Sequence, residues 1–345
     1  MSKVAVIGGG SFGTVVANIT AQNGHRVMFW MRSEELEAEV NNHHQNSQYL
    51  PGYMLPENVV ATHDMNEAVE GSEVIFVAVP SGSFRSVVKE VVKCAPSDAM
   101  LISTTKGIEA GSFMLMSQIL HEESPNAPIG VLSGPNLAKE IAANHLTGTV
   151  IASAHESVRE RVRELLKSEH FRVYTNDDMF GVELGGSLKN IYAIIAGIAE
   201  AIGMGHNTNS MLVTRGLTEM ARFGREIGAD PMTFLGLAGV GDLVVTCSTP
   251  LSRNFRIGQA LGKGKSIEAA ISEVGQVAEG VNTVKLVKEK ADELGVYMPL
   301  ATGLYKIIYE NESLRSIISS LMLTTNGFYT PSSFYGCHLP FSLLL

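Results

Sequence analysis

Short apolar runs rich in β-branched residues alternate with amphipathic stretches from residue 3 to about residue 175. Such alternation is typical of a parallel sheet covered by helices. Capping and turn residues mark some of the helices between the runs. Ser11 begins the first helix and Asn23-Gly24 ends it, and Asp64 begins a short helix that stops at Gly71. Eight strands are predicted, at Lys3–Ile7, His25–Met31, Val59–Thr62, Glu73–Val79, Met100–Thr104, Ile129–Ser133, Gly148–Ala152 and Phe171–Tyr174.

Beyond about residue 178 the strand pattern stops and longer helical patterns follow. An α/β unit followed by an all-α unit indicates a cleft between the two in which a small ligand binds. We therefore expect an α/β domain over residues 1–178, an α-helical substrate-binding domain over 179–326 and an atypical apolar tail over 327–345. The predicted helices are Gly181–Met204, Thr208–Ile227, Arg253–Leu261, Glu279–Leu294 and Ala301–Met322, the last interrupted at Asn311.

The most specific local motif is a GxGxxG sequence between the first predicted strand and the first predicted helix. Gly8 allows a tight turn, Gly10 lets the backbone approach a pyrophosphate, and Gly13 lets helix and strand pack closely. The start of the helix then faces the anion. A glycine-rich turn without a ligand is the alternative. In this position the motif favours a Rossmann-type dinucleotide-binding domain.

The end of the second strand indicates which dinucleotide binds. An NAD or FAD site usually places an acidic residue there, about 20 residues after the glycine motif, to bind the ribose hydroxyls. This chain has Arg32 instead, within the segment FWMRS. An arginine suits the 2′-phosphate of NADP, so NADP is preferred over NAD, and FAD is disfavoured. The alternative is that Arg32 is an exposed charge at a helix start.

Polar residues follow several strands of the predicted sheet. Ligands of an open parallel sheet bind beyond the carboxyl ends of the strands, so these residues are candidates for a site. Lys106 places a cation after one strand, and Ser133-Gly134-Pro135-Asn136 ends another in a turn with exposed amides. A solvated loop lysine is the alternative for Lys106.

One predicted helix places a lysine in an otherwise apolar and small-residue surrounding. Gly185 and Gly186 precede Lys189 by one helical turn, and Ala193 and Ala196 follow it on the same face. A notch that admits a small substrate, with a partly desolvated lysine of lowered pKa acting as a base, is one interpretation. The other is close helix packing with the lysine extending to water.

Two further segments carry candidate groups. Gly236–Asp242 is predicted to be flexible and contains a single acid. Ser252 is a suitable N-cap for the next helix, and a helix start with the adjacent Arg253 is suited to bind a phosphate. An ordinary capped surface helix is the alternative.

The composition excludes several other classes. The 345 residues carry a formal net charge of −9, whereas nucleic acids and anionic membranes are bound by fields of Lys and Arg. Three cysteines without a CxxC pair provide neither a disulfide framework nor a zinc ribbon. No metal is expected. The N-terminus lacks the apolar core of a signal peptide, and a cytoplasmic protein is expected.

Taken in order, these motifs resemble those of the soluble NAD(P)-dependent glycerol-3-phosphate dehydrogenases of bacterial type. The resemblance extends from about residue 3 to residue 322. It implies a Rossmann-type domain followed by a helical domain like that of 6-phosphogluconate dehydrogenase. It also implies reversible reduction of dihydroxyacetone phosphate to sn-glycerol 3-phosphate for glycerophospholipid synthesis. The most specific segments are GGGSFGT, TTKGIE, SGPNLAKEIA, ELGGSLKN, TRGLTEM, GLAGVGDLVVTC, SRN and EGVNT.

The resemblance also implies roles for individual residues. Lys189 matches the proton acceptor of the family, and Lys106 matches a lysine that reaches both cofactor and substrate. The implied cofactor contacts are Ser11, Phe12, Arg32, Lys106, Ala138, Arg253, Val277 and Glu279. The implied substrate contacts are Lys106, Gly134, Asn136, Lys189, Asp242, Ser252, Arg253 and Asn254.

Two features depart from the family pattern. Asn136 stands where the family often has Ser or Thr, and the chain after Met322 continues into an aromatic, apolar run. Residues 327–345 lie outside the resemblance, and we expect their removal to leave activity intact.

Two alternative functions remain open at this point. Another two-domain dehydrogenase of the hydroxyacid or ketopantoate type would not need the Ser252-Arg253-Asn254 phosphate site. A non-catalytic NADP-sensing protein would lack a base. A homodimer is expected, because closed dimers are the commonest oligomers of soluble proteins.

Overall fold

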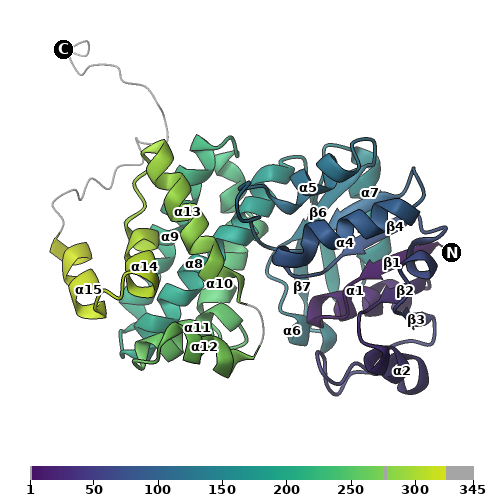
Figure 1. The fold of residues 1–345 in the computed structure, drawn as a ribbon, viewed down its shortest axis with the longest axis horizontal. Coiled ribbons are helices and arrows are strands. Elements are labelled where there is room, and N and C mark those ends of the chain that lie inside the picture. Colours follow the sequence, from purple (N-terminus) through teal and green to yellow (C-terminus); the bar gives the residue numbers. More distant parts are fainter. Residues whose placement is uncertain (1, 276–277, 324–345) are drawn as a thin grey trace, which may run out of the picture.

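The computed structural model describes residues 2–275 and 278–323. These residues fold into a sheet-containing half and an all-helical half (Figure 1). One eight-stranded sheet has the order β3-β2-β1-β4-β5-β6-β7-β8. All eight predicted strands are confirmed, with ends that differ by no more than two residues. The strands are β1 (Lys3–Ile7), β2 (Arg26–Trp30), β3 (Val59–Thr62), β4 (Val74–Val77), β5 (Met100–Ser103), β6 (Ile129–Ser133), β7 (Thr147–Ala152) and β8 (Phe171–Asn176).

The expectation of a fully parallel sheet is wrong at one pair, because β7 runs antiparallel to β6. The only helix in the connection between them is α6 (Ala138–Ala142), which has five residues. Five helical residues span about 7.5 Å. A parallel crossover must return along a strand of roughly 17–20 Å, so this connection turns the chain back instead.

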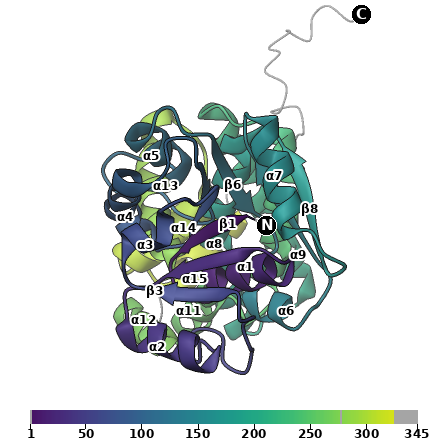
Figure 2. The same ribbon diagram turned by 90° about the vertical axis from the view of Figure 1, so that its right-hand side faces the viewer.

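Helices cover both faces of the sheet, as the alternation predicted. Along β1, Val4 and Val6 pack with the helices on one face, while Ala5 and Ile7 pack with those on the other. Figure 2 shows α3, α4 and α5 on one side of β1, and α1 and α7 on the opposite side. These helices are α1 (Ser11–Gln22), α3 (Met65–Val69), α4 (Ser81–Cys94), α5 (Met116–Glu123) and α7 (Glu156–Leu166), and α2 (Glu34–His43) lies beyond β2.

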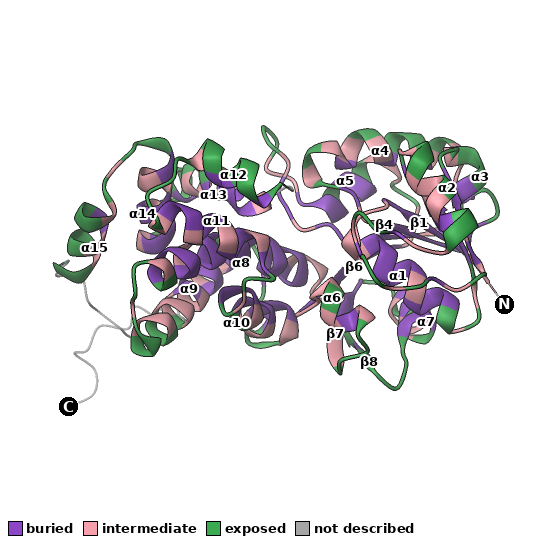
Figure 3. Ribbon diagram, turned by 90° about the horizontal axis from the view of Figure 1, so that it is seen from below, coloured by how far each residue is buried: buried purple, intermediate pink, exposed green. Residues whose placement is uncertain are grey.

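The helical half is built around α8 (Met179–Ala201), which is buried along almost all of its length (Figure 3). A Cβ on Gly197 would lie 2.0 Å from the Phe255 carbonyl oxygen, so the backbones of α8 and α11 touch. The other helices are α9 (His206–Glu226), α10 (Asp242–Cys247), α11 (Arg253–Gly262), α12 (Ile267–Val274), α13 (Glu279–Leu294), α14 (Pro299–Tyr309) and α15 (Leu314–Leu323). The predicted break at Asn311 is confirmed, whereas α10 and α12 were not predicted.

The prediction that Gly236–Asp242 is flexible is wrong. A 3-10 turn over Pro231–Leu235 leads into a π-helical turn over Leu237–Gly241, which continues directly into α10. A Cβ on Gly239 would lie 2.1 Å from the Phe234 carbonyl oxygen. The glycines therefore allow close packing, and they fix Asp242 as a buried residue at the start of α10.

No helix within residues 2–275 and 278–323 combines the length and apolar character needed to cross a bilayer. The same described residues contain no cluster of His, Cys, Asp and Glu suited to bind a metal ion. The tail predicted over 327–345 lies outside the described residues.

Candidate active site

The glycine turn after β1 fits a dinucleotide. Gly8 has a φ of +126°, and a Cβ there would lie 2.4 Å from the Ala78 carbonyl oxygen. A Cβ on Gly13 would lie 2.0 Å from the Gly8 carbonyl oxygen, so both glycines are needed for packing. Gly10 faces open space, with nothing within 4 Å of a Cβ. That space lies over the start of α1, where a pyrophosphate would be bound by backbone amides.

Three of the predicted cofactor contacts lie in this turn or on a helix packed against α1. Ser11 is the first residue of α1, and its hydroxyl donates to the Tyr49 carbonyl over 2.8 Å. Phe12 is partly buried against the core between the sheet and its helices. Ala138 begins α6, which packs against α1.

Arg32 lies beside the glycine turn and is exposed. The Gly8 amide donates to the Trp30 carbonyl over 2.9 Å, and a Cβ on Gly9 would lie 2.9 Å from Met31 Cβ. The end of β2 is therefore in contact with the turn. Ser33, the next residue, caps α2 by accepting from the Leu36 amide.

The centre of the candidate site is a carboxylate held between two ammonium groups. Lys106 Nζ lies 2.5 Å from Asp242 Oδ2, and Lys189 Nζ donates to Asp242 Oδ1. Lys106 comes from the sheet-containing half, whereas Lys189 (on α8) and Asp242 (on α10) come from the helical half. We call these three residues the Asp242 trio. The trio lies where the two halves meet. Because Lys106 is bonded to Asp242 there, the alternative that it is a solvated loop lysine is wrong.

The Lys189 ammonium is buried rather than extended to water, and only 7% of the residue is exposed. Its Nζ also donates to Thr246 Oγ1 over 2.7 Å. Burial lowers the pKa of Lys189 to about 7; the Asp242 charge opposes this shift and the Lys106 charge adds to it. The lysine is thus suited to exchange a proton near neutral pH.

The glycines next to Lys189 serve a different purpose from the predicted substrate notch. A Cβ on Gly185 would lie 2.8 Å from the Ala238 carbonyl oxygen, and one on Gly186 would lie 2.6 Å from Ser133 Oγ. Protein atoms therefore occupy the space that these glycines leave. Their absence of side chains lets the π-helical turn and the end of β6 approach α8 beside Lys189.

The turn after β6 supports Lys106. Gly134 has a φ of +141°, and its carbonyl accepts from Lys106 Nζ over 3.1 Å. Thr149 Oγ1 donates to the Ser133 carbonyl over 3.1 Å, so it accepts from Asn136 Nδ2 over 2.8 Å. The Asn136 amide oxygen is left unpaired within the described residues.

The start of α11 is buried, which contradicts the alternative of an ordinary surface helix. Ser252 is its N-cap, as predicted, and accepts from the Phe255 amide over 3.2 Å. Burial lowers the pKa of the Arg253 guanidinium. Asn254 Oδ1 accepts from the Gly280 amide over 3.0 Å and so joins α11 to α13.

Glu279, at the first residue of α13, reaches across to the sheet-containing half. Its carboxylate accepts from the Ser81 amide over 3.1 Å and from the Ser81 hydroxyl over 2.5 Å. Ser81 begins α4, directly after β4. Val277, predicted to contact the cofactor, lies outside the described residues.

Sequence reasoning missed Thr246, which binds Lys189. It follows Asp242 by four residues, so both side chains lie on one face of α10. A prediction of α10 from the sequence would have indicated that Thr246 lies beside Asp242.

A doubly wound sheet with a phosphate-binding glycine turn, a helical partner and a buried lysine between the two defines a class of two-domain, nicotinamide-dependent dehydrogenases. Family models narrow this class. The N-terminal model of NAD-dependent glycerol-3-phosphate dehydrogenase matches residues 3–159, and the C-terminal model matches residues 178–319. The chain belongs to the NAD-dependent glycerol-3-phosphate dehydrogenase family, whose members are oxidoreductases.

Individual relatives agree with this assignment. A glycerol-3-phosphate dehydrogenase [NAD(P)+] of Teredinibacter turnerae is 53% identical over 320 residues, covering 93% of this chain and 94% of the relative. The crystal structure of glycerol-3-phosphate dehydrogenase from Coxiella burnetii superposes with a TM-score of 0.90 at 36% identity, covering 94% of this chain and 99% of that one. A ketopantoate reductase from Ralstonia eutropha shares the fold alone, with a TM-score of 0.57 at 16% identity over 93% of this chain and 99% of that one.

Proposed function

We propose that this protein catalyses the reversible NAD(P)H-dependent reduction of dihydroxyacetone phosphate to sn-glycerol 3-phosphate, which supplies glycerophospholipid synthesis. The observation that carries the proposal is the buried Lys189 ammonium, held by Asp242 at the meeting of the two halves. The test is NADPH oxidation with dihydroxyacetone phosphate. Absence of turnover there, together with turnover of an unphosphorylated keto acid, would refute the substrate assignment.

The side chains divide the reaction between them. When bound, the nicotinamide supplies the hydride that reaches C2 of the ketone. Lys189 gives a proton to the C2 oxygen during reduction and accepts it during oxidation. Lys106 orients the same end of the substrate, and Asp242 holds both ammonium groups in place.

The phosphate of the substrate binds at the start of α11. Ser252 caps this helix, and the Arg253 guanidinium adds a charge to the positive end of the helix dipole. Asn254 is fixed by its bond to the Gly280 amide, which orients its amide group. Gly134 and Asn136 complete the substrate site on the opposite side, next to Lys106.

The cofactor site combines the Gly8–Gly13 turn with residues from both halves. Gly8, Gly10 and Gly13 form the pyrophosphate cradle. Contacts from Ser11, Phe12, Arg32, Lys106, Ala138, Arg253, Val277 and Glu279 complete the proposed set. Glu279 supports this role because its carboxylate already lies against Ser81 at the start of α4.

Neither alternative function is favoured. The ketopantoate-type assignment does not need a phosphate site, whereas Ser252 caps α11 and Arg253 places a partly desolvated cation at its start. A non-catalytic sensor leaves unexplained a buried lysine whose pKa is near 7.

We expect Arg32→Ala to raise the KM for NADPH by about 10-fold and to leave the KM for NADH nearly unchanged, because only NADPH carries the 2′-phosphate that the guanidinium binds. Arg26→Ala is the matched control, since Arg26 is also exposed but lies at the opposite end of β2. Steady-state kinetics with both cofactors measure the effect. Equal losses for NADH and NADPH would contradict the role of Arg32.

The protein is further proposed to be a cytoplasmic homodimer, with its domains divided after residue 178. The free thiols of Cys94 and Cys247 suit a reducing compartment. Light scattering of the purified protein tests the dimer.

For the tail, truncation after residue 326 is expected to leave kcat and both KM values unchanged, and a loss of activity would assign the tail a function.

A further inference from the structure

The segment that carries Lys106 is fixed to both halves of the molecule. It continues from Lys106 as a loop to Leu115, closed by a β-bridge between Ile108 and Leu115. Both residues of the bridge are buried in the core of the helical half. The ring of Phe113 also packs edge-on against Phe223 of α9, with centroids 6.1 Å apart. The loop thus inserts its apolar side chains into the helical half.

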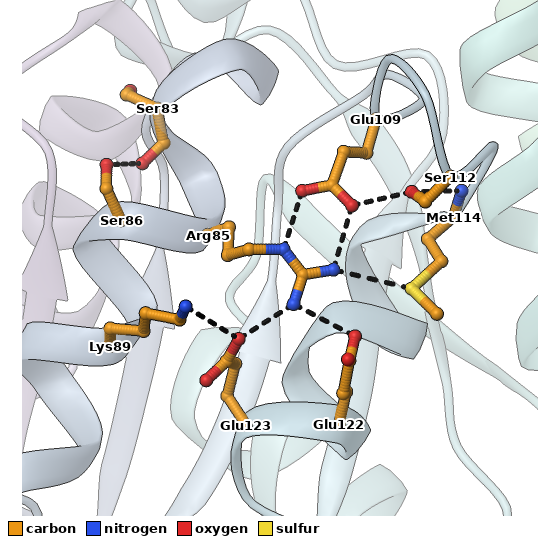
Figure 4. A network of polar contacts seen from close by, with 9 residues as sticks. All are labelled: Ser83, Arg85, Ser86, Lys89, Glu109, Ser112, Met114, Glu122 and Glu123. Carbon is orange, nitrogen blue, oxygen red and sulfur yellow. Dashed lines mark hydrogen bonds and ion pairs between the residues drawn. The ribbon is translucent and has the colours of Figure 1, made fainter.

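The polar side of the same loop is held by Arg85 of α4 (Figure 4). Arg85 Nε and Nη2 donate to the two carboxylate oxygens of Glu109 over 2.7 and 2.8 Å. Its Nη1 donates to Glu122 over 2.9 Å and to Glu123 over 2.7 Å. Nη2 also approaches the Met114 sulfur at 3.4 Å. Each of the three guanidinium nitrogens therefore has a hydrogen-bond partner, and the two-point bond fixes the orientation of the Glu109 carboxylate.

The spacing along α4 makes this bond relevant to Lys106. Ser81 and Arg85 are one helical turn apart and face the same side. A Cβ on Gly107 would lie 2.5 Å from Ser81 Cβ, so α4 touches the loop directly after Lys106 and again at Glu109. From the other side, Ser187 Oγ of α8 accepts from the Gly107 amide over 3.0 Å. The backbone that presents Lys106 is held between α4 and α8.

We propose that Arg85 is a positioning residue for Lys106, and that it acts through Glu109. The inference rests on the proposed role of Lys106 at the substrate. Arg85 touches none of the residues of the Asp242 trio. Without it, Glu109 and its neighbours Glu122 and Glu123 repel one another, and the loop loses its polar anchor. Lys106 Nζ then samples positions away from Asp242 Oδ2.

The first test compares Arg85→Met with Lys89→Met. Both variants remove one positive charge from α4, but Lys89 is exposed and contacts only Glu123, at 3.8 Å. We expect Arg85→Met to lower kcat/KM for dihydroxyacetone phosphate by about 10- to 100-fold, because a shift of about 1 Å in a positioned group costs rate on this scale. The KM for NADPH rises as well, because Lys106 also belongs to the proposed cofactor contacts, and Arg85→Lys restores little because a lysine cannot form the two-point bond.

The second test compares two carboxylates that both bind Arg85. Glu109→Gln alters the residue on the Lys106 loop, whereas Glu123→Gln alters one on α5. We expect only Glu109→Gln to reproduce the loss of kcat/KM. Hydrogen–deuterium exchange should also rise in peptides covering residues 104–115 of the Glu109→Gln and Arg85→Met proteins, and nowhere else to the same extent.

Distinct results overturn distinct claims. Equal effects of Arg85→Met and Lys89→Met, or of Glu109→Gln and Glu123→Gln, would overturn the positioning role. Unchanged exchange in the loop would do the same. If Lys106→Ala itself retains wild-type kcat/KM, the proposed role of Lys106 fails instead.

Discussion

Replacing Lys189 by methionine should lower kcat by about 10²- to 10⁴-fold, the range that a positioned acid–base group contributes. Methionine fills a similar apolar volume but exchanges no proton. The side chain of Lys189 is 8% exposed and donates to Asp242 and Thr246. Methionine would make neither of these hydrogen bonds. The KM for NADPH should change by less than about 2-fold, because Lys189 is not among the proposed cofactor contacts.

The pH dependence of the reaction provides the control. With a pKa lowered to about 7, Lys189 is neutral above that pH and accepts a proton, so oxidation of glycerol 3-phosphate should accelerate as pH rises through about 7. Reduction needs the ammonium as a proton donor, and its rate should fall over the same range. Lys189→Arg, which stays charged, should lose activity as Lys189→Met does. A mild effect of Lys189→Met, or an unchanged pH profile, would remove Lys189 from the chemistry.

Removal of the guanidinium of Arg253 should raise the KM for dihydroxyacetone phosphate by about 100-fold, because a charge-assisted hydrogen bond contributes roughly 1.5–3 kcal/mol. Burial lowers the pKa of this group, so it is partly desolvated before the substrate arrives. The measurement is steady-state kinetics of Arg253→Ala at saturating NADPH.

Two controls separate phosphate binding from a general loss of structure. Lys263→Ala removes a positive charge from the opposite, exposed end of α11 and should leave the KM within about 2-fold of wild type. Unphosphorylated dihydroxyacetone should react equally slowly with wild type and Arg253→Ala, because it lacks the group that Arg253 binds. An Arg253→Ala protein that loses activity equally on both substrates would contradict the phosphate role.

Features whose cause is local in sequence were predicted well. The strand β1 is a run of apolar residues followed by the glycines whose turn and packing require no Cβ, and both appear where expected. The Ser252 N-cap was likewise predicted, since a cap depends on residues only three positions apart. The isolated lysine of α8 was identified because a charge in an apolar helix needs a specific partner.

Features set by tertiary packing were not predicted. Gly236–Asp242 contains three glycines, which indicated flexibility, whereas the close approach of Phe234 to Gly239 fixes it as a π-helical turn. The contact of Gly185 with Ala238 could not be read from helix spacing, which shows a face but not what covers it. The bond from Arg85 to Glu109 joins residues 24 positions apart on separate elements, and nothing in either segment indicates the other.

The sharing of one carboxylate by two ammonium groups makes the charge at the meeting of the two halves depend on the protonation of Lys189. With Lys189 protonated, the Asp242 trio carries a net charge of +1, since two ammonium groups face one carboxylate. In the proposed reduction Lys189 gives up its proton, and the trio becomes neutral. The charge of the trio therefore changes in every proposed turnover, and reprotonation of Lys189 from solvent restores the net charge of +1 for the next substrate.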